Sequence, residues 1–215
     1  MSDIIYSLPF LWEGLFVTLQ VSVLVLLIAT SLGILGGISL AYGPFFLYWP
    51  IRAYVDIIRG IPVLVLIFTV YYGAPALGLN MSNFTAGVAA LAGFSAAHVT
   101  EISRGAIQSI ASGQMEAGKS IGLTFWQRLT YIILPQAVRR FLPPWINAVT
   151  EMVKGSALIS LVGIVDLMLA VQQVIGRIYR PMPLYITGAF FYFIINYSLS
   201  STSRRLEKKY SYVNK

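Results

Sequence analysis

Long apolar runs alternate with short polar stretches along the 215 residues of this chain. About twenty apolar residues cross the hydrocarbon core of a bilayer, so each charge-free run of that length predicts one membrane span. The run between Gly60 and Val99 is too long for one crossing, and turn-forming residues from Gly73 to Asn83 divide it. The pattern predicts five transmembrane helices, at about 15–42, 55–72, 84–107, 137–165 and 183–203.

Composition supports an all-α integral membrane protein. Of the 215 residues, 57% are hydrophobic and 11% are charged, whereas about a quarter of a soluble domain is charged. No polar stretch is long enough for a soluble domain, so residues 1–215 are expected to form one membrane domain. The chain has no cysteine, which excludes disulfides, thiolate metal sites and cysteine nucleophiles.

The basic residues orient the predicted helices, because Lys and Arg are retained on the cytoplasmic side of a membrane. With five crossings, all but three of the 15 Lys and Arg residues fall at or near one side. Arg177 and Arg180 fall on the other side, and Lys154 lies within the fourth span. The cytoplasmic set includes the tail after the fifth span, so the C-terminus is predicted to lie in the cytoplasm and the N-terminus outside.

A polar, helix-breaking insert separates the third and fourth spans on the predicted cytoplasmic side. Glu116 is expected in the first turn of a short helix, where a carboxylate suits the helix dipole, and Gly122 in the left-handed conformation that ends it. Thr124 and Gln127 have the spacing of a capping box for a second helix, and Pro135 is expected to mark a break. The insert is therefore predicted to form two short helices joined at a glycine.

This insert resembles the cytoplasmic signature of permease subunits of ABC importers, which is Glu-Ala-Ala, three residues, Gly, nine residues and Ile-x-Leu-Pro. Six positions match at that spacing: Glu116, Ala117, Gly122, Ile132, Leu134 and Pro135. Gly118 stands in place of the second alanine. The resemblance implies that residues at about 110–136 form a coupling loop that docks on an ATPase. The simpler alternative is an amphipathic helix lying on the membrane surface.

Two further segments resemble the polar amino-acid permeases of this family. Asp56–Pro62 is similar to their Glu-x-x-Arg-Gly-Thr-Pro, and Glu101–Ile110 is similar to their Glu-Ile-x-Arg-Gly-x-Ile-x-Ser-Ile. The chain departs from the family at Asp56, at Ile61, and at Gly155, where the family usually has Asp after the lysine. The resemblance points to the histidine, glutamine and arginine permease group, closest to an arginine or basic amino-acid permease, with the ABC type I importer permease fold.

The resemblance also implies the partners of the chain. Two permease subunits, identical or similar, form the pathway, two ABC ATPase subunits drive it, and an extracytoplasmic amino-acid-binding protein delivers the solute. The expected location is a bacterial cytoplasmic membrane, as a multi-pass protein in the lipid bilayer. The chain has no Gly-rich phosphate loop followed by Lys and Ser or Thr, so it is not expected to be an enzyme, and ATP and Mg are used by the partner ATPase. No bound cofactor, metal site or nucleic acid is predicted.

Charges within a bilayer are costly unless they are paired or hydrated. Asn147, Glu151 and Lys154 are spaced to share one face of the fourth span, with Glu151 near mid-depth. One interpretation is an internal pair between Glu151 and Lys154 that neutralises itself and joins helices. The other is that Glu151 faces a hydrated cavity and binds the cationic group of a solute, while Lys154 or a backbone amide near Gly155 binds the carboxylate of an amino acid. Ser95 and His98 of the third span are further candidates for substrate binding, although a single histidine is more often a hydrogen-bonded packing residue.

Two acid–base pairs lie near the predicted cytoplasmic ends of the second and third spans. Glu101 and Arg104 are one helical turn apart and are expected to form a structural pair. Asp56 and Arg59 have the same spacing and the same expectation, with a cross-helix network or gate as the alternative.

The predicted function is ATP-driven import of polar, basic amino acids, with arginine favoured because a guanidinium forms two parallel hydrogen bonds with a carboxylate such as Glu151. The alternative is an ion-coupled carrier or channel subunit for small polar solutes, which would not need a cytoplasmic helix-glycine-helix loop. A membrane enzyme would need a convergent set of catalytic groups near one interface, and the sequence shows none.

Overall fold

The computed structural model describes the backbone of residues 2–211 and the side chains of residues 6–205. This part of the chain forms helices and no strands, which confirms the all-α prediction. The α-helices are α1 (Ser2–Tyr42), α2 (Phe45–Gly60), α3 (Val63–Ala76), α4 (Asn83–Gln108), α5 (Ser112–Ser120), α6 (Phe125–Arg128), α7 (Leu134–Gly155), α8 (Leu167–Ile178) and α9 (Pro181–Ser211). A π-helix (Leu129–Ile133) joins α6 to α7, and a 3₁₀ helix (Ser156–Val162) follows α7.

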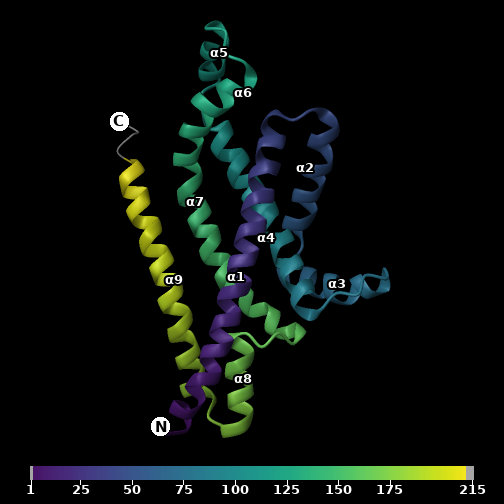
Figure 1. Cartoon of the computed structure of the whole chain (residues 1–215), viewed down its shortest axis with the longest axis vertical. Coiled ribbons are helices and arrows are strands. Elements are labelled where there is room, and N and C mark those ends of the chain that lie inside the picture. Colours follow the sequence, from purple (N-terminus) through teal and green to yellow (C-terminus); the bar gives the residue numbers. More distant parts are fainter. Residues whose placement is uncertain (1, 212–215) are drawn as a thin grey trace.

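The helices form an elongated bundle with two distinct ends (Figure 1). α1, α4, α7 and α9 run along its length. α5 and α6 extend beyond one end, toward which α9 runs, and α8 lies at the other end beside the start of α1 (Figure 1). The start of α1 and the end of α9 therefore lie at opposite ends of the bundle, as the five predicted crossings require.

Length and apolarity show which described helices are able to cross a membrane. Tyr6–Tyr42 and Pro181–Arg205 each qualify alone, and up to four spans result if each of two bent helix pairs counts as one. Those pairs are Phe45–Gly60 with Val63–Ala76, and Phe125–Val162 with Leu167–Ile178. α4 is the remaining predicted crossing, and its sequence is rich in Ala, Gly, Ser and Thr rather than in large apolar residues. Small residues suit a helix that packs against other helices rather than against lipid.

Among the described helices, α1 and α4 share the most extensive contact. Gly33, Gly36 and Gly37 of α1 leave no room for a side chain, because a Cβ on each would lie 2.5, 2.6 and 2.3 Å from atoms of Val99, Thr100 and Ser103, respectively. Small residues at this spacing let two helix backbones approach each other closely in a membrane. The pair forms the scaffold on which the other elements pack.

The second predicted span is wrong as a single straight helix over 55–72. The chain forms two helices instead, α2 and α3, whose axes differ in direction by 109°. The break is at Ile61, which adopts an extended conformation with φ −102° and ψ 133° before Pro62. A proline disfavours the helical conformation of the residue before it, and it has no N–H to continue the helix. The first of the two helices also begins earlier than predicted, at Phe45 directly after Pro44.

Two local predictions for the insert are also wrong. Glu116 is the fifth residue of α5 and not part of its first turn, because that helix begins at Ser112. Pro135 does not break the helix: it sits in the first turn of α7, and the chain stays helical from Phe125 to Val162. Proline is tolerated in the first turn of a helix, where its missing N–H costs little, and here the π-helix joins α6 directly to α7.

The sequence analysis missed α8 entirely. This helix follows Asp166, whose carboxylate accepts a hydrogen bond from the N–H of Leu169 at 3.0 Å and so caps it. The Asp166 carboxylate also accepts one from the Tyr192 hydroxyl of α9 at 3.3 Å, and the N–H of Leu167 donates to Thr18 Oγ1 of α1 at 3.0 Å. These bonds fix α8 against α1 and α9.

Candidate coupling loop and polar membrane face

The glycine between α5 and α6 ends the first helix as predicted. Gly122 has φ +82°, in the left-handed region. Its N–H donates to the carbonyl of Lys119 at 3.0 Å, and the N–H of Leu123 donates to the carbonyl of Gly118 at 3.1 Å. This pair of bonds is the Schellman arrangement, which satisfies the last carbonyl groups of a helix. The direction of α5 relative to α6 is therefore set by hydrogen bonds around Gly122.

The capping box of α6 is also confirmed. The N–H of Gln127 donates to Thr124 Oγ1 at 3.3 Å, and the N–H of Thr124 donates to Gln127 Oε1 at 2.8 Å. Each residue thus satisfies the other's backbone donor at the start of the helix.

Gly118 allows α5 to pack closely on the segment that follows it. This residue is buried, and a Cβ on it would lie 2.7 Å from Ile132 Cδ1 and 2.8 Å from Arg128 Cγ. Arg128 crosses the same contact, where its Nη1 donates to the carbonyl of Met115 at 3.4 Å. The glycine that replaces the second alanine of the signature therefore lets α5 pack closer to Arg128 and Ile132 than an alanine would allow.

The loop is attached to the bundle by an apolar cluster. Its buried members come from the end of α4 and the residues after it, the π-helix and α7: Ile107, Ile110, Leu129, Ile133 and Ala137. Leu134 packs against this cluster, and the ring of Phe125 lies edge-on to that of Tyr42 at the end of α1, with centroids 5.5 Å apart. Force applied to the loop would therefore be transmitted to α1, α4 and α7 together.

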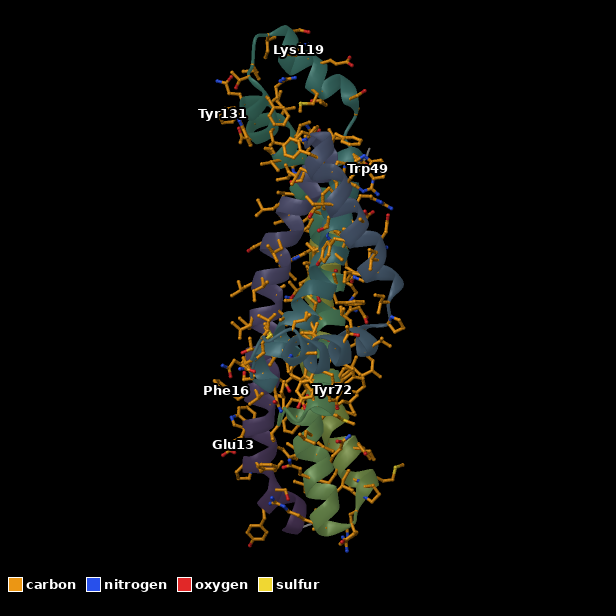
Figure 2. The ribbon with its side chains drawn as sticks, turned by 90° about the vertical axis from the view of Figure 1, so that its right-hand side faces the viewer. Glu13, Phe16, Trp49, Tyr72, Lys119 and Tyr131 are labelled. Carbon is orange, nitrogen blue, oxygen red and sulfur yellow. The ribbon has the colours of Figure 1, made fainter. Side chains whose placement is uncertain are left out.

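The outer surface of the loop is open. Glu116, Ala117 and Pro135 are exposed, and the large apolar side chains of Ile121 and Trp126 are 75% and 68% exposed. Lys119 lies at the far end of the molecule (Figure 2). Four of the six matching signature residues are exposed, namely Glu116, Ala117, Gly122 and Pro135. Leu134, in contrast, packs against the apolar cluster that attaches the loop to the bundle.

Glu101 is the centre of an ion-pair network between α2 and α4. Its side chain is 15% exposed and lies 2.7 Å from Arg104 Nη2, 3.1 Å from Arg52 Nη1 and 3.8 Å from Arg59 Nη1. The predicted pair of Glu101 with Arg104 is confirmed. The predicted pair of Asp56 with Arg59 is wrong, because Asp56 pairs with Arg52 at 2.6 Å while Arg59 reaches across to Glu101. The cross-helix alternative is therefore the arrangement that forms.

Arg52 was not singled out by the sequence analysis, although it joins both acids of this network. The sequence could have predicted one of its two ion pairs, since Arg52 and Asp56 have the (i, i+4) spacing of a helical ion pair. The bond to Glu101 depends on α2 folding back along α4.

One face of α7 is polar and open along its length. The exposed residues recur at helical spacing, namely Arg140, Pro144, Asn147, Glu151 and Lys154. The opposite face is buried and apolar. Met152, next to Glu151, belongs to a core cluster with Val21, Val25 and Ala29, which lie near the middle of α1. The polar face therefore reaches the middle of the bundle.

Glu151 and Lys154 form the predicted pair on this face. Lys154 Nζ lies 2.8 Å from Glu151 Oε1, and the two side chains are 53% and 73% exposed in the single chain. Hydrocarbon does not solvate an exposed ion pair, so this face requires water or another protein surface. Asn147, one turn before Glu151, shares the exposed face.

Ser95 and His98 lie in different surroundings from this pair. Ser95 is 5% exposed within α4. His98 is half-buried, its Nδ1 lies 3.0 Å from the carbonyl of Phe94, and its ring lies 4.5 Å from that of Phe94. Among the side chains of residues 6–205, neither residue bonds to Asn147, Glu151 or Lys154. The structure thus joins Glu151 with Lys154 and leaves the two α4 residues on a separate helix.

The chain thus has a two-helix loop attached to the end of an apolar bundle, with some of the signature residues on the loop's surface. One protein family matches most of the chain. Residues 33–212 match the family described as "Binding-protein-dependent transport system inner membrane component". The chain belongs to this family. The match confirms the resemblance to permease subunits of ABC importers, and it covers the candidate coupling loop and the polar face of α7.

Individual relatives agree with this assignment. The chain is 34% identical over 208 residues to the "Probable amino-acid ABC transporter permease protein YckA" of Bacillus subtilis (strain 168), covering 97% of this chain and 92% of the relative. It is 35% identical over 205 residues to the "Glutamine transport system permease protein GlnP" of Escherichia coli (strain K12), covering 94% of each.

A solved structure shares the fold. The "Crystal structure of an amino acid ABC transporter with histidines" contains a chain that superposes with a TM-score of 0.88 at 32% sequence identity, covering 96% of each chain. The predicted ABC type I importer permease fold is thereby confirmed.

Proposed function

We propose that this chain is the translocation subunit of an ATP-driven importer that carries polar amino acids, with arginine favoured, across a bacterial cytoplasmic membrane. The observation that carries the solute assignment is the open polar face of α7, where Glu151 and Lys154 are paired yet 73% and 53% exposed. The competing solute is glutamine, which a close relative is named for.

The polar face of α7 lines the pathway in this proposal. A second permease subunit, identical or similar to this one, would line the other side of the pathway with its own α7. Asn147, Glu151 and Lys154 would then contact water and solute instead of lipid. This placement removes the cost of an ion pair exposed to hydrocarbon. It also explains why the opposite face of α7 is apolar and packed against α1 and α4.

Arginine suits this pair better than glutamine does. The substrate guanidinium would replace the Lys154 ammonium on Glu151 and form two parallel hydrogen bonds there. Lys154, which lies one helical turn from Glu151, would then be free to bind the substrate carboxylate. Glutamine has no cation on its side chain, and its α-ammonium group cannot form the two parallel hydrogen bonds that a guanidinium forms with Glu151. Ser95 and His98 stay candidates for contacts from α4.

Coupling to ATP would occur through α5 and α6. The end of the bundle that carries them would face the cytoplasm together with the C-terminus, and two ABC ATPase subunits would receive the exposed surface around Glu116 and Ala117. ATP and Mg would be bound by those subunits. Because the loop packs on α1, α4 and α7, closure of the ATPase pair would move these helices as a unit. The network around Glu101, near the same end, would hold α2 to α4 as they move.

The solute assignment is tested by uptake of labelled arginine and glutamine in cells that lack other carriers for both. Glu151→Gln keeps the size of the side chain and removes its charge. The expected result is a loss of at least tenfold in arginine uptake with a much smaller change for glutamine, if any. Glu13→Gln is the matched control, since Glu13 is an exposed carboxylate on α1 away from α7. An unchanged arginine preference in Glu151→Gln would overturn the assignment.

The energy source distinguishes an ATP-driven importer from an ion-coupled carrier. Uptake is measured in vesicles with and without ATP on the side of α5 and α6, with ionophores present to remove ion gradients. The importer requires ATP and tolerates the ionophores. Uptake that needs the gradient and not ATP would support the carrier instead.

A further inference from the structure

The carboxyl group of Asp166 is buried where α8 meets α1 and α9. Asp166 has 0% of its surface exposed. A Cβ on Gly14 of α1 would lie 2.9 Å from the Asp166 carbonyl oxygen, and a Cβ on Gly188 of α9 would lie 3.0 Å from Val171 Cγ2 of α8. The three helices therefore pack closely at this point, in the half of the bundle that lies away from α5 and α6 (Figure 1).

The carboxylate is held by uncharged groups. Its oxygens accept hydrogen bonds from the N–H of Leu169 at 3.0 Å and from the hydroxyl of Tyr192 at 3.3 Å. The adjoining N–H of Leu167 donates to Thr18 Oγ1 of α1 at 3.0 Å. The start of α8 is therefore bonded to both α1 and α9, through Asp166 and the residue that follows it.

The charged side chains of the surrounding helices do not neutralise Asp166. Glu13 of α1, Arg177 of α8 and Arg180 before α9 are all exposed. Arg177 lies instead over the ring of Phe10, with its Cζ 5.5 Å from the ring centroid. Among the side chains of residues 6–205, none forms an ion pair with Asp166. The titratable group in contact with it on α9 is the Tyr192 hydroxyl.

These surroundings suit a neutral carboxyl better than a charged one. When the group is protonated, one oxygen still accepts from Leu169, and the other, as a hydroxyl, is able to donate to the Tyr192 oxygen. When it is ionised, a charge without a cation lies beside Leu15, Leu167 and Val171, the apolar side chains that join α8 to α1. A buried carboxylate of this kind is destabilised unless water reaches it. Loss of the proton therefore favours loosening of α8.

α8 continues the segment that carries the polar face of α7. The 3₁₀ helix Ser156–Val162 leads from Lys154 toward Asp166, and the axes of the helical stretches on the two sides of the break differ by 50°. We propose that Asp166 is a proton-operated latch, which closes α8 onto α1 and α9 when it takes up a proton and releases α8 when it loses one. The inference rests on the proposed function, which places α8 toward the outside and requires this end to open before solute reaches Glu151. Acid outside the cell would therefore slow import.

Hydrogen exchange of the α8 amides tests the latch in the complete importer in nanodiscs. Asp166→Asn keeps a good helix cap and cannot ionise. From about pH 8 to about pH 5, which is above the ordinary aspartate pKa of about 3.9, protection of Leu167–Ile178 relative to intrinsic exchange should rise at least fivefold in the wild type. Protection in Asp166→Asn should stay at the wild-type low-pH level throughout. Asp166→Ser, another uncharged cap, serves the same purpose if the first variant does not assemble. An equal rise in wild type and variant would overturn the latch.

Two further variants separate titration from a structural role. Tyr192→Phe removes a donor to the ionised carboxylate, so the midpoint of the pH response should move to higher pH. Glu13→Gln removes an exposed carboxylate of α1 and should leave the midpoint unchanged. A midpoint that moves in Glu13→Gln and stays fixed in Tyr192→Phe would show that another group titrates, and would overturn the assignment to Asp166.

Uptake of labelled arginine connects the latch to import. It is measured in cells that lack other carriers, at an outer pH of about 5 and of about 8. The ratio of uptake at the lower pH to uptake at the higher pH should be at least twofold smaller in the wild type than in Asp166→Asn. Equal ratios would overturn the control of import by Asp166. Absence of both arginine and glutamine uptake in the wild type would overturn the proposed function, whereas the exchange measurement would still report on the latch.

Discussion

Gly37 of α1 lies so close to Ser103 of α4 that a Cβ on the glycine would be 2.3 Å from the serine Cβ. The same added atom would lie 2.8 Å from the backbone nitrogen of Arg104 and 3.0 Å from the carbonyl of Thr100. Backbone atoms in a helix do not move aside as the end of a side chain does. The distance between the two central helices is therefore set by the absence of one carbon atom.

Gly37→Ala should force α1 away from α4. We expect a loss of about 1–3 kcal/mol of stability, the range for overpacking a tight core. Thermal unfolding of the purified protein measures it. Gly93→Ala is the matched control, because a Cβ on Gly93 of α4 meets nothing within 4 Å. That substitution should be neutral or stabilising by about 0.5–1 kcal/mol, since alanine favours helix. Equal unfolding temperatures for the two variants would contradict this account of the helix contact.

Glu101→Gln should loosen the contact between α2 and α4. It leaves Arg52, Arg59 and Arg104 near one another with Asp56 as the remaining acid. Removing one partner of a fully buried pair costs about 3–5 kcal/mol, and the arginines here are 28–43% exposed, so solvent screening should reduce the loss to about 1–2 kcal/mol.

Asp56→Asn is the control for that prediction. The Asp56 side chain is 52% exposed, and an exposed ion pair contributes at most about 1 kcal/mol. Thermal unfolding at low and high salt should therefore show a large effect for Glu101→Gln and a small one for Asp56→Asn. The reverse order would show that Glu101 is not the centre of the network.

Glu116→Lys should leave the protein folded and inserted, because the Glu116 side chain is exposed and makes no ion pair among the described side chains. It should weaken association with the ATPase by tenfold or more, which is about 1.4 kcal/mol, and uncouple hydrolysis from uptake. Co-purification and parallel assays of hydrolysis and uptake measure both effects. Thr202→Lys adds a charge on the exposed surface of α9 and should leave association intact. Coupled uptake at the wild-type level in Glu116→Lys would argue that another surface receives the ATPase.

Local features of the fold could be predicted because their causes lie within a few residues. The capping box at Thr124 and the left-handed Gly122 need side chains and backbone only three to five positions apart. The boundaries of α4 came out within one residue of the prediction, since turn-forming residues precede this helix and the polar insert follows it. The Pro62 break was also visible in the sequence, but a search for spans by hydropathy alone passed over it.

The sequence by itself determined the membrane class, the two-helix loop, and the presence of Glu151 and Lys154 one turn apart within a predicted span, because hydropathy and helix capping are properties of neighbouring residues. Only the tertiary structure decided that Arg59 pairs with Glu101, that α2 and α3 diverge by 109°, and that the Glu151 face stays open while the other face of α7 is buried. Those results depend on which helices pack together, and packing joins residues that lie far apart in the chain.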